Sequence, residues 1–145
     1  VYEMCGITYP DVYTFDLKGA KIANLLEDIA DNVFNSNPLL QQGGDMSRLG
    51  GVTYSIAVAA KSGERISNLM IGGKPIDLDK TYSVSSWGGN LQKAGENLQE
   101  DKIRPVYDIT RDYIRRQKVI DVSNEGNVTL VDYDCGCPVK DSRSC

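Results

Sequence analysis

One stretch of the chain, from Gln41 to Gly51, carries residue types that could do chemistry. It holds two glycine pairs, the acid Asp45 and the base Arg48. A guanidinium donates paired, charge-assisted hydrogen bonds to oxyanions, and glycine lets a ligand approach the bare backbone. The stretch therefore predicts a binding loop that presents Arg48, Asp45 and backbone N–H groups. The alternative is a flexible connector whose charges are merely solvated.

Composition narrows the classes of protein and of partner. The 145 residues, 41% hydrophobic and 25% charged, suffice for one globular domain with a core. The net charge of −4 disfavours a nucleic-acid partner. No apolar run approaches the roughly 20 residues that a membrane span needs. We therefore expect neither nucleic acid nor a membrane among the partners.

The chain contains no histidine, which is the usual general base and the commonest metal ligand. It therefore has no Ser-His-Asp or Cys-His arrangement and no imidazole-bound metal. We predict no catalytic residue and no metal ligand within it, so the chain alone is not expected to be a complete enzyme. Because it begins at Val1 without an initiator methionine or a signal peptide, we expect a fragment of a larger protein.

Three of the four cysteines, Cys135, Cys137 and Cys145, lie close to the end of the sequence. Their Cys-x-Cys pair is one residue short of the usual zinc or redox spacing. Two interpretations stay open: a disulfide within the tail in an oxidising compartment, and an unstructured tail with free thiols. We accordingly divide the chain into a domain over residues 1–134 and a Cys-containing tail over 135–145.

The elements that position the loop follow from hydrophobic periodicity. Before it, Val12–Leu17 alternates as a half-buried strand, and apolar residues at three- and four-residue steps predict a helix from about Ala20 to Phe34. Asn35–Pro38 ends that helix. After the loop, strands are predicted at Val52–Val58, Arg65–Ile71, Lys74–Ile76 and Thr81–Ser85, with a tight Gly72-Gly73 turn between the second and third.

The last part of the chain is predicted to hold a polar loop, a helix and a strand. The loop opens at Trp87-Gly88-Gly89-Asn90 and runs to Arg104, and the final strand covers Asn127–Tyr133. The helix follows Pro105, with an apolar stripe formed by Val106, Ile109, Tyr113 and Ile114. Short strands joined by tight turns indicate an antiparallel sheet. The predicted class is α+β, a mostly antiparallel sheet packed with two principal helices.

This order of elements, with its Leu-Lys-Gly, Gly-Lys-Pro-Ile and Lys-Thr-Tyr-Ser-Val motifs, resembles the C-terminal domain of the 5′-nucleotidase family. The resemblance is best over residues 6–84. Within the family, three segments resemble the SoxB-like thiosulfohydrolases of bacterial sulfur oxidation: Ile7–Pro10, Glu27–Asn32 and the whole Gln41–Gly51 loop. The gapless Gly-Gly-Asp-Met-x-Arg-x-Gly-Gly of that loop is the most specific of these motifs.

The resemblance also indicates what the domain does not bind. In the nucleotidases two phenylalanines hold the nucleobase, one of them in a Phe-x-Gln-x-Gly-Gly pattern. Here Met46 stands at the Phe position and Arg48 at the Gln position, and Trp87–Leu91 replaces the loop of the second phenylalanine. Stacking contributes roughly 1–3 kcal/mol per aromatic contact, so adenine would gain little from this site.

For SoxB-like enzymes, the resemblance implies hydrolysis of a cysteine-S-thiosulfonate carried on the glycine-rich arm of a carrier protein, with release of sulfate. Two manganese ions in a preceding metallophosphatase-like domain would activate the attacking water. The resemblance thus implies no cofactor within this chain and two partners, the preceding domain and the sulfur-carrier protein. It also implies a periplasmic location.

The residues predicted to bind the substrate are Arg48, Asp45, Gly43, Gly44, Met46, Tyr9 and Trp87. Arg48 would bind the sulfonate, and the two loop glycines would let the carrier arm approach. Asp45 would orient Arg48 or a loop amide, or else only cap a turn. Tyr9 and Trp87 would be pocket walls, or else ordinary packing residues.

Two other functions stay open at this point. One is a 5′-nucleotidase-type phosphoesterase with a remodelled base pocket, in which Trp87 supplies a stacking face. The other is a non-catalytic module that binds a protein partner through the two glycine loops.

Overall fold

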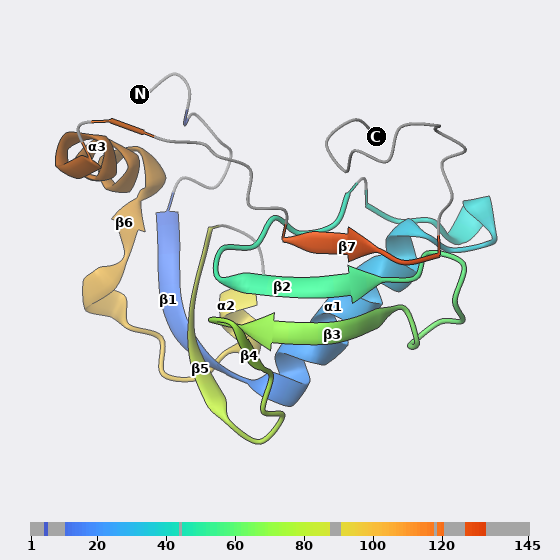
Figure 1. Cartoon of the computed structure of the whole chain (residues 1–145). Coiled ribbons are helices and arrows are strands. Elements are labelled where there is room, and N and C mark those ends of the chain that lie inside the picture. Colours follow the sequence, from blue (N-terminus) through green and yellow to red (C-terminus); the bar gives the residue numbers. More distant parts are fainter. Residues whose placement is uncertain are drawn as a thin grey trace. The chain divides into compact units, whose positions relative to one another are not determined.

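The structure is a computed structural model that describes residues 5, 11–43, 45–87, 91–117, 119–120 and 127–132. The chain divides into two compact units, residues 1–21 with 78–124 and residues 22–77 with 125–145. Each unit thus combines segments that are far apart in the sequence. The division falls within the long helix α1, Gly19–Val33 (Figure 1).

The first unit is built on strand β1, Asp11–Lys18, which lies between β5, Thr81–Trp87, and β6, Arg104–Pro105. Both pairings are antiparallel. The predicted alternation of β1 is confirmed, since the side chains of Phe15 and Leu17 are buried. β5 is two residues longer than predicted, because its pairing with β1 continues to the Val12–Trp87 pair.

The prediction of an irregular polar loop up to Arg104 is wrong for the described residues. They form the short helix α2, Leu91–Ala94, the 3-10 turn η3, Glu100–Lys102, and then β6. Between these, the backbones of Asp16 and Glu96 exchange two hydrogen bonds of 2.8 and 2.9 Å. Because such pairing uses backbone groups only, it leaves no hydrophobic pattern in the sequence.

Helix α3, Val106–Gln117, begins directly after Pro105 as predicted. Its predicted apolar stripe is only partly covered, because Val106 and Ile109 are half-buried while Tyr113 and Ile114 are exposed. No residue of α3 is fully buried. The helix is therefore held by its first two turns and by polar contacts such as the Arg104–Asp112 ion pair of 2.6 Å.

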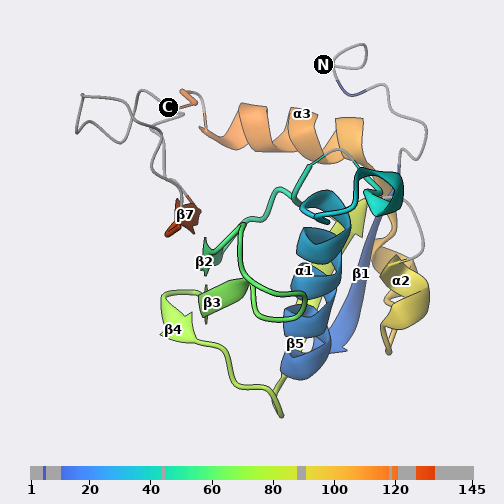
Figure 2. The same cartoon turned by 90° about the vertical axis from the view of Figure 1, so that its right-hand side faces the viewer.

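The second unit contains a four-stranded sheet with α1 on one face (Figures 1 and 2). The strand order is β4, Lys74–Pro75; β3, Ile66–Ile71; β2, Val52–Ile56; and β7, Val128–Leu130. The buried core between helix and sheet consists of Leu26, Ala30, Tyr54 and Ile56. This core confirms that the apolar face of α1 and the alternating face of β2 are the two halves of one interface.

Two strands of this sheet, β2 and β7, differ from the prediction by more than one residue. β2 ends at Ile56 rather than Val58, because the backbone amides of Val58 and Ala59 donate to the carboxylate of Asp132 at 2.8 and 2.6 Å. β7 covers Val128–Leu130, which is shorter than the predicted strand, and it pairs with β2 in parallel. Tyr133 lies outside the described residues.

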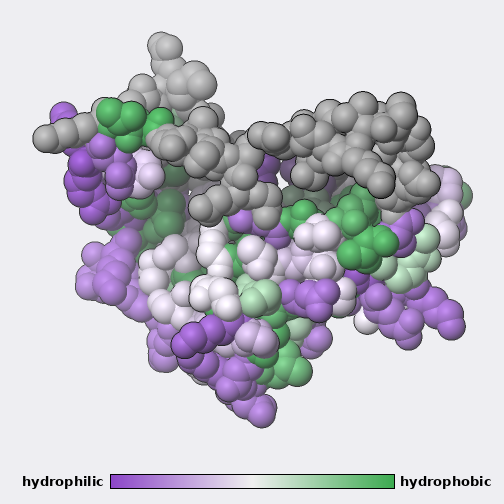
Figure 3. All heavy atoms as spheres, in the orientation of Figure 1, coloured by the Kyte–Doolittle hydropathy of each residue, from purple (hydrophilic) through white to green (hydrophobic). Residues whose placement is uncertain are grey.

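β7 is an edge strand with an apolar surface. Val128, Leu130 and the neighbouring Val131 are all exposed, and Figure 3 shows hydrophobic residues gathered over this strand. The alternation of β2 is also broken, since a register shift between Thr53 and Ser55 leaves Ser55 buried beside Tyr54.

The predicted class is confirmed as α+β, with mostly antiparallel strands and two principal helices, α1 and α3. The single predicted sheet is in fact two sheets, and one of their pairings is parallel. The Gly72-Gly73 turn is also confirmed: both glycines have positive φ, 58° and 75°, as a tight hairpin turn requires. In the described parts of the chain, no helix has the length and apolar character to cross a membrane.

Candidate binding loop

The candidate site is the loop between η2, Pro38–Leu40, and β2, and its entry is tied to the end of α1. The side chain of Asn37 accepts a hydrogen bond from the Leu39 amide at 3.0 Å and so caps η2. The Gln42 amide then donates to the carbonyl of Asn32 at 3.0 Å. The first residues of the loop are therefore fixed to the helix rather than left loose.

The middle of the loop is anchored by two apolar side chains and one amide. Met46 and Leu49 are half-buried and pack against the core of the second unit. The side-chain amide of Asn127 donates to the carbonyl of Leu49 at 2.6 Å. At the far end, the carbonyl of Gly51 accepts a hydrogen bond from the Gly72 amide at 2.8 Å. The loop is thus held at several points along its length.

Two of the loop glycines are required by the backbone itself. Gly43 and Gly51 have φ of 82° and 72°, a region that side-chain-bearing residues rarely adopt. A Cβ built on Gly43, Gly50 or Gly51 would meet no atom within 4 Å. The space beside these glycines is therefore open, as the predicted close approach of a ligand requires. Gly44 lies outside the described residues.

The two charged side chains of the loop are exposed. Arg48 and Asp45 are both exposed, and neither forms an ion pair or a hydrogen bond with any residue that the structure describes. The orientation of Arg48 by Asp45 stays a prediction, because no contact joins them. Arg48 therefore keeps the full donor capacity of its guanidinium on a backbone that is pinned at Met46 and Leu49.

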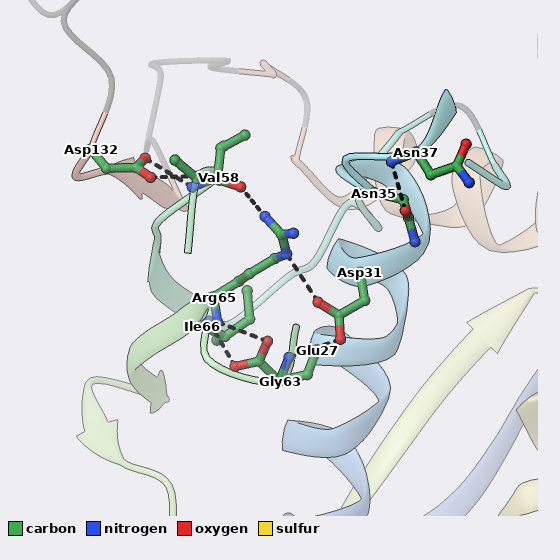
Figure 4. A network of polar contacts seen from close by, with 10 residues as sticks. Glu27, Asp31, Asn35, Asn37, Val58, Gly63, Arg65, Ile66 and Asp132 are labelled. Carbon is green, nitrogen blue, oxygen red and sulfur yellow. Dashed lines mark hydrogen bonds and ion pairs between the residues drawn. The ribbon is translucent and has the colours of Figure 1, made fainter. Parts of the chain in front are cut away.

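Arg65, in the same unit, is used in the opposite way (Figure 4). It is 6% exposed, and its Nε donates to Asp31 at 2.9 Å while its Nη1 donates to the carbonyl of Val58. The carboxylate of Glu27 accepts from the backbone amides of Arg65 and Ile66 at 3.1 and 2.8 Å. These contacts join α1 to the turn between β2 and β3, which is a structural role.

Asp31 receives several donors in this network. Burial alone would raise the pKa of the Asp31 carboxyl, but hydrogen bonds from Ser62, Arg65 and Gly63, together with the charge of Arg65, lower that pKa below its usual value of 3.8. The carboxylate therefore stays charged at neutral pH and keeps the buried guanidinium compensated.

Comparison with known proteins agrees with this fold. The family model for the 5′-nucleotidase C-terminal domain matches residues 1–101. The chain belongs to this family. It is accordingly a domain of a hydrolase family. A search of curated proteins gives no match.

Among solved structures, the chain is similar to the sulfate thiohydrolase SoxB of Thermus thermophilus in complex with glycerol, at 41% identity and a TM-score of 0.84. That match covers 90% of this chain and 24% of the SoxB chain. The fold also matches a 5′-nucleotidase precursor of Thermus thermophilus, with 22% identity and a TM-score of 0.57 over 87% of this chain and 26% of the other.

A Staphylococcus aureus protein assigned as a 5′-nucleotidase, in complex with alpha-ketoglutarate, has the same fold, at 19% identity and a TM-score of 0.59. That match covers 83% of this chain and 27% of the other. The chain thus spans about a quarter of the length of each of these three proteins.

The other predicted site residues of this family member have different outcomes. Trp87 belongs to the first unit, where it ends β5 and is 57% exposed. Tyr9 lies outside the described residues, as do the three tail cysteines. Met46 packs inward, and its predicted contact with substrate stays a prediction. Within the described ranges, no group of three or more Cys, Asp or Glu residues could hold a metal ion.

Sequence reasoning did not single out the residues that support the loop. Asn127 is the main example, since it binds Leu49 across 78 positions of the chain. Leu49 and Asn32 were likewise not recognised as anchors, and Tyr54 was seen only as one face of a strand. An asparagine carries no local signal for a contact of this range, so only the parallel placement of β7 beside β2 reveals it.

Proposed function

We propose that this chain is the substrate-binding domain of a SoxB-like thiosulfohydrolase, which hydrolyses a carrier-protein cysteine-S-thiosulfonate and releases sulfate. The observation that carries the proposal is Arg48, an exposed arginine without a partner among the described residues, on a loop that the core pins at Met46 and Leu49. The 41% identity with the sulfate thiohydrolase SoxB supports the same assignment.

The chemistry of Arg48 suits a sulfonate. A planar guanidinium donates two parallel hydrogen bonds to an oxyanion, and each bond to a charged group contributes roughly 1.5–3 kcal/mol. Because the loop backbone is already held by Asn127 and by two apolar anchors, binding orders only the arginine side chain. Gly43 and Gly50 leave open space in which the carrier arm can lie close to the backbone.

The hydrolytic step belongs, in this proposal, to a preceding metallophosphatase-like domain that would hold two manganese ions. Water adds to the sulfonate sulfur and the sulfur–sulfur bond breaks, so that sulfate leaves and a persulfide remains on the carrier. This chain supplies binding and orientation. The division into residues 1–134 and a Cys-containing tail over 135–145, and a periplasmic location, are parts of the same proposal.

The test uses the intact parent protein loaded with manganese. Sulfate release from a cysteine-S-thiosulfonate peptide with a glycine-rich arm is measured beside phosphate release from a nucleoside monophosphate. We expect sulfate and no phosphate. Phosphate without sulfate would contradict the proposal.

One observation favours a second candidate, a phosphoesterase with a remodelled base pocket. Trp87 is 57% exposed, and an exposed indole ring is a surface on which a nucleobase could stack. Because Trp87 is the single tryptophan of the chain, its fluorescence reports such stacking directly when the chain is titrated with a nucleoside monophosphate. Quenching would support this candidate, and an unchanged signal at millimolar ligand would remove it.

A further inference from the structure

Strand β7 is attached to the sheet of the second unit by hydrogen bonds rather than by buried side chains. All three of its residues are exposed, and none of them is among the described residues that form the core of this unit or pack against it. The Tyr54 amide donates to the carbonyl of Asn127, directly before β7, at 3.0 Å. The Val131 amide, directly after β7, donates to the carbonyl of Ile56 at 3.0 Å. The position of β7 therefore depends on polar contacts, several of which lie at its two ends.

The strongest of these contacts is made by Asp132, just after the end of β7. Its carboxylate accepts hydrogen bonds from the backbone amides of Val58 and Ala59, one at each oxygen, at 2.8 and 2.6 Å (Figure 4). Hydrogen bonds to a charged acceptor are stronger than those between neutral groups. The carbonyl of Val58 in turn accepts from Arg65, whose Nε binds Asp31 of α1. Asp132 therefore fastens β7 to the part of the unit that the Arg65 network holds together.

The other end of β7 reaches the candidate binding loop. The side-chain amide of Asn127 donates to the carbonyl of Leu49 at 2.6 Å, and Leu49 directly follows Arg48 in the sequence. β7 thus joins the turn after β2 to the residue beside Arg48. The family model covers residues 1–101, so β7 and the residues at its ends lie outside the range that the family model describes.

We propose that Asp132 is a positioning residue for Arg48: its carboxylate fixes β7, and β7 places the Asn127 side chain that fixes the loop. This inference rests on the proposed function, because it takes binding of the sulfonate as the role of Arg48. Asp132 itself touches no substrate. An arginine on a fixed backbone loses less freedom when it binds a ligand. Loss of the Asp132 carboxylate should therefore weaken substrate binding and leave the hydrolytic step unchanged.

The first test is Asp132→Asn in the intact, manganese-loaded parent protein, with a cysteine-S-thiosulfonate peptide as the probe. The variant keeps the shape of the side chain but has one acceptor oxygen for two backbone amides. At a temperature where the variant is fully folded, we expect KM for sulfate release to rise about 3- to 10-fold with kcat unchanged, the equivalent of one net hydrogen bond. The control is Asp28→Asn, which removes the same charge from an exposed position on α1 and should change neither quantity. An unchanged KM in Asp132→Asn would overturn the inference, since the carboxylate would then serve the fold alone.

A double-mutant cycle shows whether Asp132 acts through Asn127. If it does, the variant that combines Asp132→Asn with Asn127→Ala has the same KM as Asn127→Ala alone, because the contact with the loop is already lost. If the two increases in KM instead multiply, the two residues act independently and the inference is wrong.

Trypsin gives a readout that needs no substrate, because it cleaves after Arg48, next to the residue that Asn127 holds. We expect the intact Asp132→Asn protein to be cleaved there about 3-fold faster than the wild type or more, since the loop opens more often. Cleavage after the exposed Lys102 of η3, in the first unit, should keep its wild-type rate.

Two results of the trypsin experiment would overturn the inference. One is an unchanged rate after Arg48, and the other is an equal increase at both bonds, which would mean a general loss of stability. In either case sulfate release by the wild type would leave the proposed function standing. No sulfate release by the wild type would overturn the proposed function and this inference together.

Discussion

Arg48 and Arg65 lie in the same unit of the molecule and differ in nearly every physical respect. Arg65 is 6% exposed, and its guanidinium is bound by Asp31 and by the carbonyl of Val58. Arg48 is exposed and has no hydrogen bond or ion pair with any described residue. Both residues lie on segments that are otherwise firmly held, Arg65 directly before β3 and Arg48 on the anchored loop.

The difference between the two arginines follows from burial. A buried guanidinium must be paired, since an uncompensated charge in the interior is costly. An exposed guanidinium on an ordered backbone makes no contribution of this kind to folding. Its donors are available for a ligand. Arg65 therefore stabilises the fold, and we propose that Arg48 binds the substrate.

The largest expected effect is the loss of activity in Arg48→Ala. Two charge-assisted hydrogen bonds of roughly 1.5–3 kcal/mol each correspond to a fall in kcat/KM on the order of 100- to 10,000-fold. Because Arg48 is exposed and without a described partner, we expect its melting temperature to equal that of the wild type. Sulfate release and thermal unfolding of the intact protein measure the two quantities, and wild-type turnover would remove Arg48 from the site.

Arg65→Ala should reverse that pattern. Removing one partner of a buried ion pair costs roughly 3–5 kcal/mol, which is a large part of the stability of a domain of this size. Urea unfolding of the 145-residue chain measures the loss of free energy of unfolding. The matched control is Arg104→Ala, which removes an exposed ion pair with Asp112 and should cost only about 0–1 kcal/mol. Equal losses in the two variants would break the comparison.

Asn127→Ala should affect stability and binding together, because it releases the loop on which Arg48 sits. The 2.6 Å hydrogen bond to the Leu49 carbonyl contributes about 0.5–1.5 kcal/mol. We expect a loss of that size in urea unfolding of the chain, together with a raised KM and an unchanged kcat in the intact protein. The control is Thr129→Ala, on the exposed strand β7. If Asn127→Ala had the same KM as the wild type, the loop would not need the Asn127 anchor for binding.

The smallest expected effect is a pH dependence of the Arg65 network. The folded-state pKa of Asp31 lies below its unfolded value, so the carboxylate stabilises the fold fully above a pH of about 4. That stabilisation is lost as the pH falls through the folded-state pKa. The urea midpoint of Asp31→Asn should thus lie below that of the wild type at pH 7, and the gap should narrow below about pH 4. The control is Asp28→Asn, on the exposed face of α1, which should leave the urea midpoint at pH 7 nearly unchanged. If the difference in midpoint between the wild type and Asp31→Asn stayed constant with pH, it would contradict the link between the Asp31 pKa and stability.

The elements whose patterns are local were predictable from the sequence. The spacing of apolar residues in α1 and their alternation in β1 reflect one buried face on each element. The Gly72-Gly73 turn follows from the positive φ that glycine allows. The pairing of Asp16 with Glu96 and the parallel placement of β7 were not predictable, because they rest on backbone hydrogen bonds between distant segments.

The candidate site shows the same limit. The residue types of the loop indicated that Arg48 would be presented to a ligand, and the structure leaves it exposed. The inward packing of Met46 and the anchoring of Leu49 by Asn127 needed the fold, since a methionine and a leucine in a polar stretch suit a pocket wall and a core equally well. The attachment of β7 by Asp132 likewise emerges only when hydrogen bonds are known atom by atom.

The most direct test of the account compares the affinity of the intact, metal-depleted protein for two peptides of one sequence. One peptide carries the cysteine-S-thiosulfonate and the other an uncharged S-methyl cysteine, and each is titrated against the wild type and Arg48→Ala. If Arg48 binds the oxyanion, its removal weakens binding of the thiosulfonate peptide by about 100-fold or more and leaves binding of the uncharged peptide unaffected. The four affinities form a double-mutant cycle, which isolates the interaction between Arg48 and the thiosulfonate. An equal loss for both peptides, or no loss for either, would contradict the assignment of Arg48 to the substrate.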